Sequence, residues 1–376
     1  MKYHALWLLW FVPLSFSLAS DNSLELKGID FQLAGDYEAA KQVEQQLLLV
    51  KGSPIGHVFA LNSITTQMTW NEANTAYQDD LHYHATEILE WCKASLKKKG
   101  DRALTHFYCG QTNFAMSYYF ALNGNFYKAG KHGVIGIEQM ETALKLDPKL
   151  HDAKFHLGLA YYIADNLPPF IKAVSSLLWF IPTGNSEKSI PYLKESIIKG
   201  ERYKDVARYT LGSLFLESEL TYSEAEDHFR YLSEKFSKNP RFHLQLIFVL
   251  LIQEKFEESI FIAKDFLKNA DSNSAEYNLA KVSMIRAQLR NRELVEAQRN
   301  FFQVEPYFSS EDSKLPGWSI AWFKLTSAQL SDISNQRRRA ISEYKEIIEI
   351  SKNTYVFEEI KLAAKAGLKE PYKNYP

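Results

Sequence analysis

Cys92 and Cys109 are the residues of this 376-residue chain best suited to covalent chemistry, because they are its only thiols. They lie on two predicted antiparallel helices, at similar distances from the break at Gly100-Asp101. In an oxidising compartment, two such thiols form a disulfide if their Cα atoms approach within about 7 Å. The sequence therefore allows either a bridge between Cys92 and Cys109 or two buried, unreactive thiols.

A metal site is the weaker interpretation of the same region. His106 precedes Cys109 by three residues, whereas His82 and His84 are two residues apart and point to different sides of a helix. The sequence contains no zinc-protease, phosphate-loop or nucleophile-elbow motif. We therefore expect no metal, no cofactor, no catalytic residues and no enzymatic activity.

Composition limits the classes of partner. The formal net charge is -1, too small to attract nucleic acid or anionic lipid over a distance. Hydrophobic residues make up 46% of the chain, with only 16 Gly and 12 Pro, which suits densely packed helices. We expect a folded, helical chain that does not bind nucleic acid.

The first 19 residues resemble a secretory signal peptide. An apolar run from Ala5 to Leu18 is followed by small residues at the spacing that signal peptidase accepts, so we expect cleavage near Ala19. The run is short for a membrane span of about 20 residues, although an uncleaved anchor is the alternative. No cysteine lies near the cleavage position. The sequence therefore predicts a periplasmic or secreted protein.

Helical periodicity continues along the rest of the chain. It predicts a hairpin over residues 24–50, helices over 55–69 and 77–99, and a long helix that ends near Asn123. Pro148, Pro240 and Pro306 are expected to stop helices, because proline lacks the amide donor. A last helix, over about 356–368, should cap the fold.

A small residue on one helix, a tight turn, then alanine and a bulky apolar residue recur along these helices. Examples are Gly28 with Gly35-Asp36-Tyr37 and Ala40, and Gly212 with Ala225 and Phe229. With a step of about 34 residues, the pattern resembles the tetratricopeptide repeat family, specifically its exported bacterial members. The resemblance implies an all-α, right-handed superhelical α-solenoid of stacked antiparallel helix hairpins. We divide the mature chain into hairpins over 20–150, central repeats over 151–270, and hairpins with a capping helix over 271–376.

The resemblance also implies a binding groove, lined by the first helix of each hairpin. Carried onto this sequence, the groove positions are Phe155, Leu159, Tyr162, Tyr209, Leu216, Leu244, Phe248, Leu251, Arg286 and Arg290. Such a groove would suit an extended peptide or a helix that carries an acidic group. The alternative is that most of these side chains form the core between helices.

An apolar insertion at residues 166–182 interrupts one hairpin. As a helix it would gather Phe170, Val174, Leu177, Leu178, Trp179 and Ile181. It could lie on a membrane surface, grip a partner, close over a hydrophobic ligand, or pack back on the solenoid. The leading hypothesis is a non-catalytic scaffold that binds a protein or peptide; the alternative is a transport accessory or carrier that encloses a hydrophobic small molecule.

Overall fold

The computed structural model describes residues 17–70, 76–98, 102–166, 184–216, 219–309, 315, 317–353 and 356–373. These residues form helices joined by short turns, and no strand occurs among them. No helix in the described part of the chain is long and apolar enough to cross a membrane. The insertion at 167–182 and most of the signal-peptide region, residues 1–16, lie outside the described residues.

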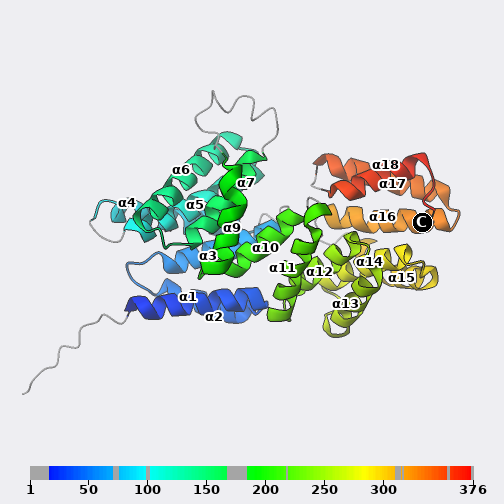
Figure 1. Cartoon of the computed structure of the whole chain (residues 1–376), viewed down its shortest axis with the longest axis horizontal. Coiled ribbons are helices and arrows are strands. Elements are labelled where there is room, and N and C mark those ends of the chain that lie inside the picture. Colours follow the sequence, from blue (N-terminus) through cyan, green and yellow to red (C-terminus); the bar gives the residue numbers. More distant parts are fainter. Residues whose placement is uncertain are drawn as a thin grey trace, which may run out of the picture.

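The helices follow one another closely along the chain (Figure 1). Their bounds are α1 Ser17–Ala34, α2 Tyr37–Leu48, α3 Ile55–Trp70, α4 Gln78–Ser95, α5 Arg102–Leu122, α6 Phe126–Leu146, α7 Asp152–Asp165, α9 Ser186–Lys199, α10 Lys204–Phe215, η1 Glu219–Thr221, α11 Tyr222–Lys235, α12 Pro240–Ile252, α13 Phe256–Asn269, α14 Ala275–Arg290, α15 Leu294–Ser309, α16 Gly317–Ile333, α17 Arg337–Asn353 and α18 Glu358–Lys369. The predicted helices over 55–69 and 77–99 correspond to α3 and α4, and the predicted hairpin over 24–50 to α1 and α2.

Consecutive helices pack as hairpins, and the hairpins pack in series. Within hairpins, α1 packs on α2, α5 on α6, α7 on α9 and α16 on α17. The first helix of one hairpin also contacts the first helix of the next, as in α3 with α5, α12 with α14 and α14 with α16. The buried apolar side chains form several clusters along the chain. This arrangement is that of an α-solenoid.

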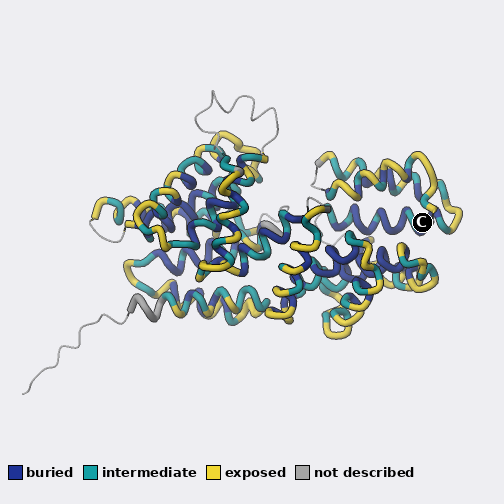
Figure 2. Tube along the Cα trace, in the orientation of Figure 1, coloured by how far each residue is buried: buried dark blue, intermediate teal, exposed yellow. Residues whose placement is uncertain are grey.

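The first helices of the C-terminal hairpins are buried far more completely than their partners. Nearly every residue from Asn278 to Leu289 of α14 is buried, as are most of α16, whereas α13 and α15 bury only a stripe (Figure 2). A helix buried all round must have neighbours on several sides. The first helices therefore form an inner layer and the second helices an outer one.

Small residues stand where paired helices approach most closely. A Cβ atom added to Gly158 of α7 would lie 2.9 Å from both Leu193 Cγ and the Ser189 carbonyl oxygen of α9. The turn between α1 and α2 uses Gly35 at a positive φ of 79°, and Asp36 caps α2 by accepting a hydrogen bond from the Ala39 amide. Close approach of the helices therefore depends on glycine at the crossing.

One predicted helix boundary is wrong. Pro306 does not stop its helix, because α15 continues through it to Ser309. The carbonyl four residues earlier belongs to Phe302, whose residue is exposed, so water can replace the hydrogen bond that proline removes. Pro148 follows the end of α6, and Pro240 is the first residue of α12, so neither lies inside the helix that precedes it.

Candidate functional site

A cavity of about 480 Å³ lies where the N-terminal helices α1 to α4 meet α10 and the start of α12. Its residues belong to, or directly precede, α1, α2, α3, α4, α10 and α12. The apolar part of the lining is Ile29, Leu33, Ala40, Ala60, Ile64, Val206 and Phe242. The polar part includes Tyr37, Lys41, Glu44, Gln67, Tyr77, Asp80, His84, Tyr209, Asn239 and Arg241. Volume and mixed lining are those of a ligand pocket.

The N-terminal half of α1 is fixed by a buried ionic cluster. Arg202, which precedes α10, donates from Nε to Glu25 Oε2 at 2.7 Å and also binds the side chain of Asn22. Its Nη1 lies 3.7 Å from Oδ2 of Asp152, the first residue of α7. Burial raises the pKa of Glu25, and the Arg202 guanidinium opposes that shift. Residues that are 177 positions apart in sequence thus hold α1 against α7 and α10.

The Asp152 carboxylate also organises the turn that carries Arg202. Its Oδ1 accepts hydrogen bonds from the backbone amides of Glu201, Arg202 and Tyr203, at 3.0, 3.1 and 3.1 Å. Buried backbone amides need such partners, and a carboxylate near the start of a helix meets that need. The turn before α10 is therefore rigidly placed to present Arg202 to α1.

The C-terminal half of α1 is held by a second contact. Asn239, which caps α12, donates from Nδ2 to the Leu33 carbonyl oxygen at 2.8 Å. Leu33 and Ala34 also pack against a buried cluster formed by Leu232, Phe236 and Phe242. Together with the Arg202 cluster, this contact closes the N-terminal part of the array around the cavity.

Two histidines meet beside the cavity. Nδ1 of His57 on α3 lies 3.0 Å from Nδ1 of His84 on α4, so one ring donates to the other. Burial and the neighbouring His57 lower the pKa of His84, while Glu44 and Asp80 oppose that shift. His82 points elsewhere, with its ring 4.5 Å from that of Tyr119. His82 and His84, which the sequence indicates are poor joint ligands, therefore face different sides of α4.

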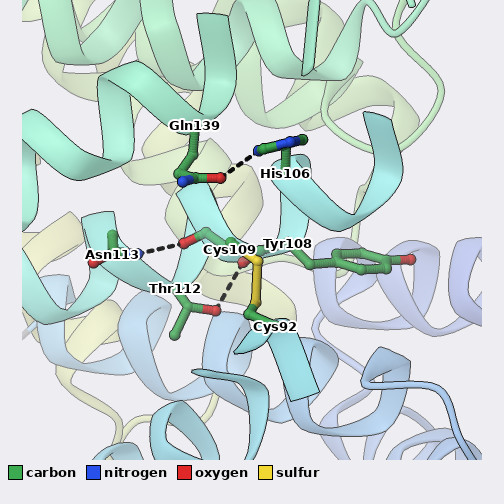
Figure 3. Close-up of a disulfide and its surroundings, with 7 residues drawn as sticks. All are labelled: Cys92, His106, Tyr108, Cys109, Thr112, Asn113 and Gln139. Carbon is green, nitrogen blue, oxygen red and sulfur yellow. Dashed lines mark hydrogen bonds between the residues drawn. A yellow bond between two sulfur atoms is a disulfide. The ribbon is translucent and has the colours of Figure 1, made fainter. Parts of the chain in front are cut away.

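The disulfide joins α4 to α5 next to this region (Figure 3). The Cys92 and Cys109 Cα atoms are 6.0 Å apart, and both residues are buried. His106 does not turn toward the sulfur atoms, because its Nδ1 pairs with Gln139 Oε1 of α6 at 2.5 Å. No group of three or more His, Cys, Asp or Glu side chains in the described part of the chain is placed to hold a metal ion.

The burial of neutral His156 on α7 should make the fold less stable in acid. Its ring packs among Phe107, Phe114, Phe155 and Tyr203, and its Nε2 is buried without a hydrogen-bond partner. Burial lowers the pKa of His156 to about 3, whereas an unfolded histidine titrates near 6.5. Because the unfolded chain binds the proton more readily, the stabilisation that comes from a neutral His156 is fully present above about pH 6.5. The free energy of unfolding then decreases as the pH falls from 6.5 toward 3.

Lowering the pH from 7 to 5 should therefore cost about 2 kcal/mol of unfolding free energy at His156. Urea unfolding at both pH values measures this loss, and His156→Phe should remove that share of the pH dependence. Equal pH dependence in the wild type and the variant would show that His156 is not held neutral by the fold.

The structure distributes the predicted groove residues over several environments. Phe155, Phe248, Leu251 and Arg286 are buried in the core. Leu159, Leu216 and Leu244 are partly buried against core clusters, as is Tyr162 in the same layer. Arg290 is exposed and pairs with Glu254. Tyr209 is the member of this set that lines the cavity. The predicted insertion residues, Phe170 to Ile181, lie outside the described residues.

Most cavity residues were missed because the cavity depends on long-range closure. Gln67, Asp80 and Arg241 carry no motif, and Arg241 of α12 reaches the same cavity as the α3 and α4 residues through the contact of α12 with α1. A usable signal was the polar face that Ser63, Thr66 and Gln67 form at i, i+3, i+4 spacing on α3.

No protein-family model matches this chain, and no curated protein matches its sequence.

Proposed function

We propose that this chain is a non-catalytic repeat protein of the tetratricopeptide type, exported to the periplasm or secreted, that binds a segment of another protein or a peptide. The observation that carries the proposal is the cavity of about 480 Å³ on the inner layer of a helical array. The first helices of four hairpins, α1, α3, α10 and α12, contribute most of its lining. In stacked hairpin arrays this concave side offers an extended binding surface.

The repeat assignment is supported by the hairpin crossings. Gly158 meets Leu193 on the partner helix, and a Cβ atom added to Gly212 would lie 3.1 Å from the Phe229 ring. Gly212 and Phe229 are a small and a large position that the resemblance pairs. The right-handed superhelix is part of this proposal. Export is supported by the Cys92–Cys109 disulfide, because such bridges persist in oxidising compartments.

Site-specific photocrosslinking tests the proposal. A benzophenone amino acid replaces Tyr37, which lines the cavity and is 52% exposed, and Tyr127 on α6, which is 51% exposed and lies outside the lining, serves as the matched control. Irradiation in the native envelope should give a polypeptide adduct from position 37 and not from position 127. Equal adducts at both positions, or none at 37, would contradict a binding role for the cavity.

The second candidate function is a carrier of a hydrophobic small molecule. The apolar lining from Ile29, Leu33, Ile64, Val206 and Phe242 favours it, because drug-sized ligands occupy such cavities. In the same crosslinking experiment a carrier would yield a small-molecule or lipid adduct at position 37. Solvent extraction of the purified protein, followed by mass spectrometry, would identify that molecule.

A further inference from the structure

The contact between His57 and His84 depends on the protons that the two rings carry. Their Nδ1 atoms lie 3.0 Å apart, so one ring donates a proton and the other accepts it with a lone pair. A first additional proton can bind the outer nitrogen of the donor ring, which keeps the hydrogen bond and makes it charge-assisted. A second additional proton must bind the accepting Nδ1, so no lone pair remains between the rings. The contact therefore requires that at least one ring is neutral.

Charged groups on the neighbouring helices act on His84 in both directions. Burial has the largest effect and lowers the pKa of His84, as do His57 and Lys41, whereas Glu44 and Asp80 oppose that shift. Glu44 already accepts a hydrogen bond from Lys41 Nζ at 2.5 Å, so part of its charge is compensated. The second proton should therefore enter the pair only below the ordinary histidine pKa of about 6.5.

The helices that pack on α3 and α4 from other sides direct their charges to other groups. From Glu25 to Asp30, the charged side chains of α1 act on these partners: Glu25 on Arg202, Lys27 on the Phe31 ring, and Asp30 on Lys235. The charged residue of α5 is Arg102, at the first position of that helix. The part of α5 beside the start of α4 is that of Tyr119, whose ring contacts His82. Glu44, Lys41 and Asp80 are thus the charges that matter at the pair.

The histidine pair lies in the wall of the cavity. His84 belongs to the lining, and His57 contacts it from α3. The Tyr83 ring packs against both imidazoles, with centroid distances of 5.8 Å to His57 and 5.1 Å to His84. Both α3 and α4 contribute further lining residues. Breaking the contact between the rings therefore acts on two helices that form the cavity.

We propose that the His57–His84 pair is a proton-operated switch in the wall of the cavity. Near neutral pH the pair joins α4 to α3. In acid, when both rings are cationic, the contact breaks, His84 leaves its place in the lining, and the cavity releases the bound polypeptide. The release rests on the proposed function, whereas the breaking of the contact does not.

Carbon-13 NMR of labelled histidines in the full chain after export tests the switch without a ligand. In the wild type, the His57 and His84 signals should show two separate protonation steps, because the first proton opposes the second. His57→Asn keeps a hydrogen-bonding side chain beside His84 but binds no proton, so His84 should then titrate in one step. A single common step for both rings in the wild type would overturn the inference.

Photocrosslinking at position 37 tests the release. Lowering the pH from 7 to 5 should reduce the polypeptide adduct about tenfold, the factor that corresponds to one pH unit of coupling between two sites. His57→Asn should remove most of this pH dependence. His82→Asn is the matched control, because the His82 ring lies against Tyr119 and not against the pair, and it should behave like the wild type.

The comparison between these proteins separates the switch from other effects of acid. All of them retain His156, so its effect on stability is common to them, and circular dichroism at pH 5 checks that each is folded. Equal loss of adduct in the wild type and in His57→Asn would overturn the switch. Two NMR steps with an adduct that does not change with pH would overturn the release. Absence of a polypeptide adduct at pH 7 would contradict the proposed function instead, and the NMR titration would still decide the switch.

Discussion

Replacing Arg202 by methionine should lower the free energy of unfolding by about 3–5 kcal/mol at pH 7. The substitution keeps an apolar side chain of similar length but removes the cation that faces Glu25 and Asp152, whose side chains are only 2% and 4% exposed. Two buried carboxylates would then lie near each other without the cation that faces both of them. Urea unfolding followed by circular dichroism measures the loss.

Controls separate this effect from loss of a surface charge. Arg299→Met on the exposed face of α15 should change stability by no more than about 0.5 kcal/mol. Adding Glu25→Gln to Arg202→Met should restore part of the loss, because one of the two buried charges is then removed. If Arg202→Met unfolds within about 1 kcal/mol of the wild type, the ionic cluster does not hold α1 in place.

Removing the disulfide should cost about 3 kcal/mol, the value for a closed loop of roughly 15 residues. Cys92 and Cys109 are 17 positions apart and join α4 of one hairpin to α5 of the next. Because both are buried, a reductant should act mainly on the unfolded chain. Urea unfolding with and without reductant, with alkylation of free thiols, measures the difference.

The Cys92→Ala/Cys109→Ala variant is the control for this measurement. It should unfold at the lower urea concentration of the reduced protein, and adding reductant should not shift it further. Thiol titration of the denatured, exported protein should find no free thiol. Two free thiols, or an unchanged unfolding midpoint after reduction, would show that the bridge does not form.

Local patterns were sufficient to predict most helices. The stripe of Leu81, Ala85, Ile88 and Cys92 recurs at helical spacing, and these residues form the buried side of α4. Gly35-Asp36 marked a turn because glycine accepts a positive φ and aspartate caps the next helix. Counting residues outward from Gly100-Asp101 also placed Cys92 and Cys109 at matching levels along two adjacent helices, within reach of each other.

The binding site could not be predicted in the same way. Repeat alignment assigned Phe155, Phe248 and Arg286 to an open groove, but inner helices pack on one another and bury these side chains. The contact of Glu25 with Arg202 spans 177 positions, and that of Leu33 with Asn239 spans 206. Neither pair belongs to a local pattern, so the closure that forms the cavity is visible only in three dimensions.

Hydrogen exchange of the α1 backbone amides tests most directly whether this helix closes the array around the cavity. Helices near a chain end usually fray and exchange fast. The closure predicts that amides from Glu25 to Ala34 are protected as strongly as those of α3, because Arg202 and Asn239 hold both halves of α1. Fast exchange along α1 while α3 stays protected would contradict the fixed position of α1 beside the cavity and the binding role assigned to the cavity.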